Sequence, residues 1–247
     1  DFSLTDTQRE MVETARSFGK KVLEPAEIEL DRIADPGAVF RDERYWEALS
    51  GCFRLGFHKM SMAESYGGLG LDPTTTGMVW EELARYGAGF AATLLPAAIV
   101  PQLVCILCPQ KRELVERFVL PFCQDETGRT ISAWGSSEPD VGSDGSNYYD
   151  VKVRHRTRAV LRRGRYVLSG TKSNFVSNAG IAHVYLVFAC VDPSRGLRGS
   201  GAFVVPADAP GVCREKALDK IGLRVLNQAA VHFEDVEVPE EYMIFPP

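Results

Sequence analysis

The sequence predicts an α+β protein, in which an all-helical amino-terminal domain is followed by a domain built on an antiparallel β-sheet. Apolar residues before residue 125 recur at helical spacing, and after residue 130 they alternate with polar residues at the period of a strand. The chain has 247 residues, which is enough for two ordinary domains that each bury a core. We therefore expect residues 1–125 to form the helical domain and residues 126–247 the sheet domain.

The helical half begins with a recognisable start signal. Thr5 and Gln8 have the spacing of a capping box, and an apolar stripe from Met11 to Val22 follows on one helical face. Pro25 is expected to end or bend that helix, because proline cannot donate the helical hydrogen bond. Four further helices are expected at 45–55, 74–86, 91–107 and 110–122, with a glycine-rich turn at 66–71.

The pattern of the second half predicts strands separated by turns that contain Gly, Pro, Asp and Ser. In the basic run from Arg154 to Arg165 the charged residues alternate with apolar or small ones, which is typical of a half-buried strand with a solvated outer face. The expected strands are 130–134, 150–161, 165–169, 183–191, 200–206 and 229–238.

Composition excludes several classes of function. The net charge is −5 with acidic and basic residues mixed, so we expect no nucleic-acid partner. We identify no apolar run of the ~18 residues that a membrane span needs, and no signal peptide at the start. The cysteines are scattered, and Cys105 and Cys108 lie in an apolar run without partners, which indicates free thiols in a reducing compartment. We expect a cytoplasmic protein, or a mitochondrial matrix protein in a eukaryote. The four histidines stand apart, so no metal site is predicted.

The segment from Trp134 to Asp144, WGSSEPDVGSD, carries the first functional signal. Read alone, Ser-Ser-Glu-Pro-Asp is a good turn. It also resembles the signature at the start of the sheet domain of acyl-CoA dehydrogenases, where a hydroxyl residue precedes Glu-Pro and Gly-Ser-Asp follows. A flavin needs short hydroxyl and backbone donors at N5 and its pyrimidine edge. The resemblance implies flavin contacts at Trp134, Ser136, Ser137 and Gly142, and a contact of Ser143 with acyl-CoA.

A second segment, Gly170 to Asn178, is similar to that family's Gly-x-Lys element followed by an aromatic, an aliphatic and a hydroxyl residue. The implied flavin contacts are Phe175, Val176 and Ser177, although Phe175 stands where tryptophan is usual and one residue later. The stretches 64–70 with 81–84, and 220–224 with 231–239, agree in order, and Arg224 is implied to bind substrate. Asn227 and Gln228 replace the family's usual Asp-Thr, which leaves the substrate contacts of that loop open.

The resemblance implies a FAD-dependent oxidoreductase of fatty acid metabolism, which converts an acyl-CoA to a 2-enoyl-CoA with hydride transfer to flavin N5. It also implies a barrel-like sheet domain and electron-transfer flavoprotein as acceptor. In the family, the catalytic base lies on a third, helical domain, and this sequence ends about where the linker into that domain would begin. The catalytic residue is therefore unknown. A homo- or hetero-oligomer is expected to supply the third domain. Two alternatives remain: a related acyl-CoA oxidase or flavin monooxygenase, and a non-catalytic scaffold subunit of a heteromeric dehydrogenase.

Overall fold

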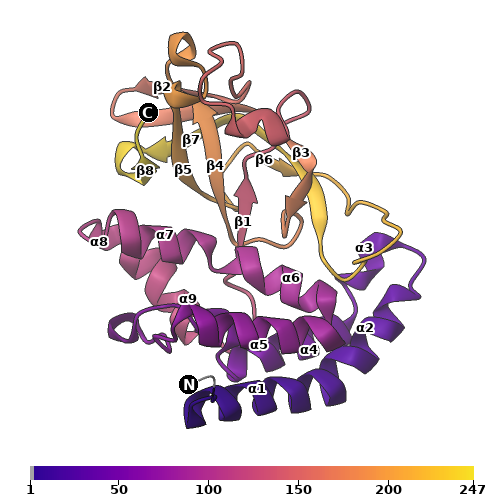
Figure 1. Ribbon diagram of the computed structural model, residues 1–247. Helices are drawn as coiled ribbons and strands as arrows, with labels where there is room; N and C mark the ends of the chain where they lie inside the picture. Colours follow the sequence, from indigo (N-terminus) through magenta and orange to yellow (C-terminus); the bar gives the residue numbers. More distant parts are fainter. Residues whose placement is uncertain (1–2) are drawn as a thin grey trace. The chain divides into compact units, whose positions relative to one another are not determined.

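The computed structural model describes residues 3–247, which form two compact units (Figure 1). The helical unit comprises the chain up to Leu95 together with Phe122–Gly128 and Asp219–Leu226, and the sheet unit comprises Pro96–Pro121, Arg129–Leu218 and Asn227–Pro247. Secondary structure changes from helix to strand between Gln124 and Ser132, close to the expected position. The compact units nevertheless cross that position, since helix α7 (Ile99–Leu107) packs against strands of the sheet unit.

The first helix confirms the predicted cap and corrects the predicted end. In α1 (Asp6–Phe18), the Gln8 amide donates to Thr5 Oγ1 at 3.2 Å and the Thr5 amide donates to Gln8 Oε1 at 3.0 Å. The helix does not end at Pro25. It passes through a π-helical turn (Gly19–Leu23) into α2 (Glu24–Asp31), where Pro25 lies in the first turn of the new segment. Proline is tolerated at such a position, because no helical partner is required for its missing N–H.

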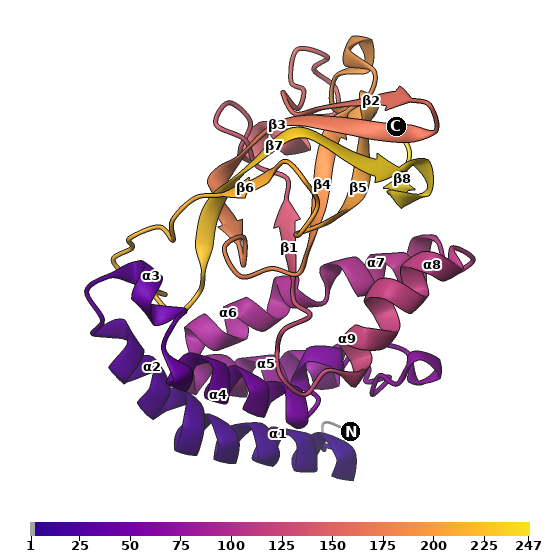
Figure 2. The same cartoon turned by 180° about the vertical axis from the view of Figure 1, so that it is seen from behind.

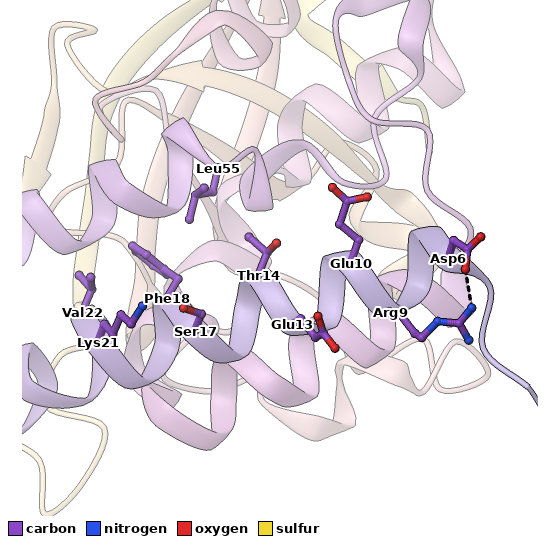
Figure 3. Close-up of a pocket in the computed structure, with 10 residues that line it drawn as sticks. All are labelled: Asp6, Arg9, Glu10, Glu13, Thr14, Ser17, Phe18, Lys21, Val22 and Leu55. Carbon is purple, nitrogen blue, oxygen red and sulfur yellow. Dashed lines mark hydrogen bonds and ion pairs between the residues drawn. The ribbon is translucent and has the colours of Figure 1, made fainter.

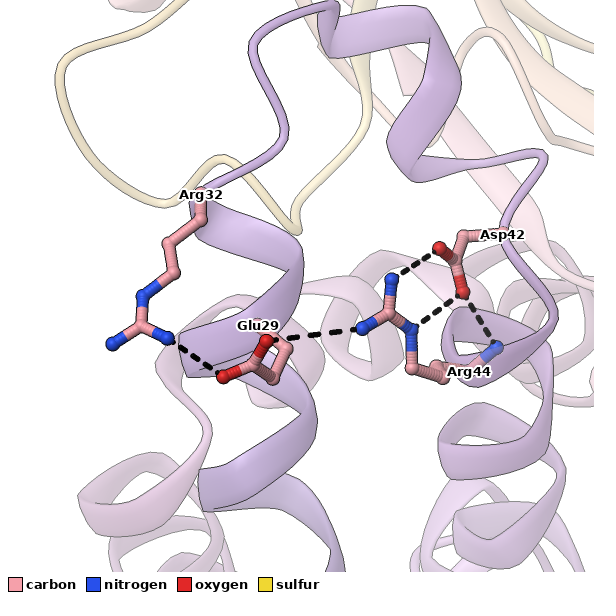
Figure 4. A network of polar contacts seen from close by, with 4 residues as sticks. All are labelled: Glu29, Arg32, Asp42 and Arg44. Carbon is pink, nitrogen blue, oxygen red and sulfur yellow. Dashed lines mark hydrogen bonds and ion pairs between the residues drawn. The ribbon is translucent and has the colours of Figure 1, made fainter.

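Acidic residues cap the next helices of this unit, which are α3 (Pro36–Val39), α4 (Glu43–Arg54) and α5 (Pro73–Tyr86). Asp42 accepts from the Arg44 amide at 2.9 Å and also binds the Arg44 guanidinium (Figure 4). Glu29 on α2 lies between Arg44 and Arg32, so this exposed network connects α2 with the start of α4. The hydrogen bonds from Arg44 lower the pKa of Asp42 to about 2.

The expected helix at 91–107 is two helices, α6 (Ala88–Ala97) and α7, separated at Ala98. By length and composition, the stretch Ala88–Leu107 is the one helical stretch among residues 3–247 that could cross a membrane. The expectation that no such run exists was therefore wrong. The run is hard to recognise in the sequence because Pro96, Pro101 and Gln102 interrupt its apolar residues. One such stretch is weak evidence for a membrane span, because core helices pass the same test of length and composition, and half of its apolar window is buried inside the protein. The last helical region contains α8 (Arg112–Leu114), a π-helical turn (Val115–Val119) and α9 (Leu120–Gln124).

The sheet unit contains one eight-stranded sheet in the order β6-β7-β3-β2-β4-β5-β8, with β1 paired to β4. Neighbours are antiparallel except for β1 with β4 and β2 with β4. The sheet is not closed into a barrel, since β6 and β8 each pair with only one strand, and the barrel-like expectation is corrected accordingly. The strands are β1 (Ser132–Gly135), β2 (Arg158–Arg162), β3 (Arg165–Ser177), β4 (Val184–Cys190), β5 (Ser200–Pro206), β6 (Val212–Arg214), β7 (Gln228–Pro239) and β8 (Met243–Phe245).

Two expected strands have different limits in the structure. The strand expected at 150–161 forms only at β2, and the one expected to stop at Ser169 continues to Ser177 because β7 pairs along it (Figure 2). Gly170, with φ of +149°, lies at an irregularity in that pairing, and a Cβ there would come 2.5 Å from the Thr157 Cα. Strands β6 and β8 were not predicted, because three residues are too few to show alternation.

Candidate functional site

A buried lysine joins the two motif segments. Lys172, on β3, donates from Nζ to Glu138 Oε1 at 2.7 Å and to the Phe188 carbonyl at 2.6 Å. Its third acceptor is the Ser136 carbonyl at 3.4 Å, so every ammonium hydrogen has a partner. Both charged side chains have no solvent exposure. The segment after β1 is thereby attached to the middle of β3.

The charges of this pair are stabilised by backbone donors as well as by each other. Glu138 accepts from the amide of Arg156 and from the amide of Thr157, the latter at 3.1 Å. Burial acts to raise the pKa of Glu138, but the Lys172 ammonium and these hydrogen bonds outweigh it and lower the pKa. Burial lowers the pKa of Lys172 to about 8, although the Glu138 carboxylate opposes the shift. The two groups are therefore an ion pair at neutral pH.

His155 lies beside this ion pair and is neutral. Its Nδ1 is 2.9 Å from Ser200 Oγ, and its Nε2 has no hydrogen-bond partner within the described part of the chain. Burial and the Lys172 charge lower the pKa of His155 to about 4, against the opposing effect of Glu138. Sequence reasoning missed this polar cluster of Glu138, His155 and Lys172. The glutamate and lysine belong to the recognised motifs, but their separation of 34 residues shows no pairing pattern.

The backbone next to the ion pair brings the predicted flavin contacts together. The Ser173 amide donates to the Ser137 carbonyl at 2.9 Å, which holds the two segments in contact. Trp134 is 43% exposed and stacks on Phe188 with ring centroids 5.7 Å apart, and Phe175 is 69% exposed. Both rings can therefore offer apolar contact surface to a bound molecule.

The predicted hydroxyl groups differ in how far the protein itself uses them. Ser136 and Ser137 are partly exposed, and neither hydroxyl has a hydrogen-bond partner among residues 3–247. Ser177 Oγ instead accepts from Gln228 Nε2 at 3.2 Å, and the same amide group donates to the Phe175 carbonyl at 3.3 Å. Gln228, which departs from the family pattern, therefore stabilises the backbone and the hydroxyl of the Phe175–Ser177 segment through hydrogen bonds.

Other predicted site residues have mainly structural surroundings. Val176 is 2% exposed, so its side chain contributes to the core. The exposed Gly142 donates its amide to Asp144 Oδ1 at 2.7 Å, and Ser143 begins an exposed 3-10 turn (Ser143–Ser146). Asn227 is buried, and its Oδ1 accepts from the Gly180 amide at 2.7 Å. The proposed ligand contacts of Val176, Gly142 and Ser143 stay predictions.

Arg224 belongs to the helical unit, unlike the other predicted site residues. Its guanidinium binds the Asp219 carboxylate and donates to the Lys220 carbonyl at 3.0 Å. It also donates to the carbonyls of Ile33 at 2.7 Å and Ala34 at 3.2 Å. These bonds fasten the 219–226 segment to the turn after α2, and the substrate contact of Arg224 stays a prediction.

A surface groove in the helical unit contains none of the predicted site residues. It has a volume of about 850 Å³ and runs along α1, with Phe18, Val22 and Leu55 at one end and Glu10 and an Asp6–Arg9 ion pair at the other (Figure 3). The groove contains no residue of either motif segment, so we assign it no catalytic role.

The residues of the motif segments suit an amphipathic ring cofactor. A flavin has an apolar benzenoid end, for which the exposed Trp134 and Phe175 provide aromatic surface. Its polar edge needs donors, which the unpartnered hydroxyls of Ser136 and Ser137 can supply. No group of His, Cys, Asp and Glu that could hold a metal ion occurs among the described residues.

Two family sequence models match the chain. Residues 5–106 match "Acyl-CoA dehydrogenase, N-terminal domain", and residues 133–236 match "Acyl-CoA dehydrogenase, middle domain". The chain belongs to the acyl-CoA dehydrogenase family. The short-chain-specific acyl-CoA dehydrogenase of Megasphaera elsdenii is 32% identical over 248 residues, which cover 99% of this chain and 60% of that protein.

Solved structures agree with this family assignment. Butyryl-CoA dehydrogenase from Megasphaera elsdenii has a TM-score of 0.80 and 31% identity, with coverage of 99% of this chain and 60% of that one. A chain in a structure described as the electron transferring flavoprotein of Acidaminococcus fermentans has a TM-score of 0.81 and 29% identity, with coverage of 99% and 59%. The acyl-CoA dehydrogenase-like fold is confirmed, and the chain spans about 60% of the length of these relatives.

Proposed function

We propose that this chain is the flavin- and thioester-binding part of a FAD-dependent acyl-CoA dehydrogenase, which converts an acyl-CoA to a 2-enoyl-CoA. Bound FAD would accept, at N5, the hydride that leaves Cβ. The observation that carries the proposal is the Lys172–Glu138 ion pair, which holds the Ser136–Ser137 segment against the strand that bears Phe175. The names of the relatives, which are acyl-CoA dehydrogenases, support the substrate class.

Each exposed residue of the two segments has a proposed role. The hydroxyls of Ser136 and Ser137 donate to the polar edge of the flavin, while Trp134 and Phe175 contact its apolar rings. Ser143 contacts the acyl-CoA. Together these contacts bind and orient the ring, and the aromatic side chains exclude water from it.

Glu138 is a carboxylate close to this site, but its environment is unsuitable for the proton abstraction at Cα. A general base works best with a pKa near the working pH and within reach of the substrate. Glu138 is fully buried, its pKa is lowered, and its oxygens are occupied by Lys172, Arg156 and Thr157. We therefore assign Glu138 a positioning role and assign the base to no residue of this chain.

The partners of the proposed reaction are an acyl-CoA substrate and an electron acceptor. Electron-transfer flavoprotein is the acceptor we propose, supported by the similarity to a chain in a structure of an electron transferring flavoprotein. We also propose that a further helical domain, from a longer form of this chain or from another subunit, completes the catalytic site. This proposal is supported by the coverage of only 60% of the relatives' length.

Flavin binding tests the proposal directly. FAD is titrated into the purified protein while quenching of flavin fluorescence is recorded for the wild type, Ser137→Ala and Phe175→Ala. We expect each substitution to weaken FAD binding about tenfold, since one lost contact is worth about 1–2 kcal/mol. Ser50→Ala on α4, in the helical unit, is the matched hydroxyl control and should leave binding unchanged. Equal affinity of Ser137→Ala and wild type would contradict the site assignment.

A second experiment identifies the reaction. Native mass spectrometry of the purified material shows whether FAD and a longer or second chain accompany this one. The complete protein is then mixed with an acyl-CoA, and loss of the oxidised flavin spectrum is expected. Reoxidation by electron-transfer flavoprotein supports the dehydrogenase, whereas rapid reoxidation by oxygen with release of hydrogen peroxide would replace it with the oxidase alternative.

A further inference from the structure

A second pocket lies in the sheet unit, where β2 and β4 come together. Arg158 on β2 pairs in parallel with Cys190 at the end of β4. The pocket has a volume of about 350 Å³ between the 154–160 run and the 190–193 segment. Its lining includes Arg154, His155, Arg156, Arg158, Cys190 and Val191, and contains no carboxylate.

The protein supplies fewer negative than positive charges at this pocket. Within residues 3–247, no carboxylate forms an ion pair with the guanidinium groups of Arg154, Arg156 and Arg158. Two acids lie near the pocket, and Asp192, which has only neutral hydrogen-bond partners from Ser194, balances at most one of the three guanidinium charges. Asp192 accepts from the Ser194 amide at 3.0 Å and the Ser194 hydroxyl at 2.6 Å, and Glu138 is held by Lys172.

The pocket brings Arg154, Arg156 and Arg158 together. All three guanidinium-bearing residues line it, together with the buried His155 and Ala159. Like charges on one side repel each other, which destabilises the protein when the pocket is empty. A bound anion removes this repulsion. Burial raises the pKa of the Cys190 thiol, the charges of Arg154 and Arg158 act to lower it, and those of Asp192 and Glu138 act to raise it. Both guanidinium groups are therefore close enough to Cys190 to act on it.

We propose that this pocket binds a phosphate monoester group through Arg154, Arg156 and Arg158. The planar guanidinium fork matches phosphate oxygens with two parallel hydrogen bonds, and a dianion balances more than one arginine. The volume is at the lower end of the ~300–1,000 Å³ of ordinary ligand pockets, which fits a phosphate with a small attached group. Its source is either free phosphate or the 3′-phosphate of a CoA thioester, and the second source rests on the proposed function.

Isothermal titration calorimetry in phosphate-free buffer tests the pocket with three probes: inorganic phosphate, CoA and 3′-dephospho-CoA. The test variant is Arg154→Gln/Arg158→Gln, and the matched control is Arg162→Gln, which removes an exposed charge on β2 outside the pocket. We expect the double variant to lose at least about tenfold in affinity for phosphate, and the control to change less than about twofold. Melting temperatures at or above that of the wild type confirm that both variants are folded.

The probes separate the two sources. If CoA binds about tenfold more tightly than 3′-dephospho-CoA, and the double variant removes that difference, the 3′-phosphate occupies the pocket. If the wild type binds inorganic phosphate but does not discriminate between the two CoA forms, the pocket binds free phosphate and the assignment to the 3′-phosphate of CoA is wrong. The FAD titration tests the proposed function separately from this result. If phosphate does not bind, or binds the double variant as tightly as the wild type, the proposal is overturned.

Alkylation of Cys190 gives an independent readout. Cys190 lies in the pocket, whereas Cys213 on β6 is exposed and outside it. Peptide mass spectrometry after iodoacetamide treatment should show that phosphate slows alkylation of Cys190 at least twofold and leaves Cys213 unchanged. Equal rates at Cys190 with phosphate and with chloride at matched ionic strength would count against occupancy of the pocket.

Discussion

Lys172 Nζ lies 2.7 Å from Glu138 Oε1, and both side chains are completely shielded from solvent. The two residues belong to separate sequence motifs, each of which also carries predicted flavin contacts. The ion pair therefore gives the charged residue of each motif a structural role in the interior of the protein. Its role is to set the distance between the Ser136–Ser137 segment and β3.

Breaking this pair should be costly, because it leaves an unpaired buried charge. Lys172→Met and Glu138→Gln should each lower the free energy of unfolding by about 3–5 kcal/mol. The double variant Glu138→Gln/Lys172→Met should lose less than the sum of the two single variants, since both charges are gone. Urea unfolding of the four proteins measures these values. Arg165→Gln breaks the exposed Arg165–Glu237 pair on β3 and β7 and should cost at most about 1 kcal/mol. Additive losses would show that the pair is not coupled.

Burial of His58 predicts a loss of stability in mild acid. Its Nε2 is 3.0 Å from the Phe122 carbonyl, Nδ1 has no partner in the described chain, and the ring stacks on Phe53 at 4.0 Å. Burial, followed by the Lys59 charge, lowers the pKa of His58 to about 4. The unfolded chain takes up the proton first, near its usual pKa of about 6.5, so stability falls as pH drops from about 6.5 towards 4.

Thermal and urea unfolding between pH 7 and 4.5 check this pH dependence. The contribution of His58 should be at most about 3 kcal/mol, lost progressively below pH 6.5. His58→Gln retains a donor for the Phe122 carbonyl but does not titrate, so its stability should depend less on pH. Parallel curves for the variant and the wild type would show that another group is responsible.

The glycine-rich turn at 66–71 should be intolerant of a side chain at one position. A Cβ on Gly68 would come 2.1 Å from the Met62 carbonyl oxygen, so Gly68→Ala must displace backbone. We expect a loss of at least about 2 kcal/mol, measured by urea unfolding. A Cβ on Gly77, within α5, would meet no atom within 4 Å, and Gly77→Ala should stabilise by up to about 1 kcal/mol. Equal effects at the two positions would contradict the steric explanation.

Arg224 should stabilise the position of the 219–226 segment against the turn after α2. Arg224→Gln removes the bonds to the carbonyls of Ile33 and Ala34 and should cost about 1–3 kcal/mol. Hydrogen exchange should become faster in that segment, measured by mass spectrometry. Arg85→Gln, which removes a largely exposed charge from α5, is the control and should leave exchange unchanged. Unaltered exchange in Arg224→Gln would contradict this structural role, and the predicted substrate contact would be the remaining role for Arg224.

The sequence was sufficient for those features that depend on local chemistry. The Thr5–Gln8 capping box and the glycine end of α4 follow from residues within one turn, and both are confirmed. Period-two alternation located the longer strands for the same reason. It was misleading at 150–157, where burial alternates only from Arg154 to Thr157 and no strand forms.

The order of the motifs along the chain was enough to identify the family and its α+β organisation, because helical spacing, strand alternation and short signatures are properties of neighbouring residues. Only the tertiary structure decided that Glu138 and Lys172 form one buried pair, that Arg224 is held by the turn after α2, and that three arginines share a pocket beside Cys190. Those relationships depend on pairing between strands distant in sequence and on exclusion of water, and neither leaves a periodic signal in the chain.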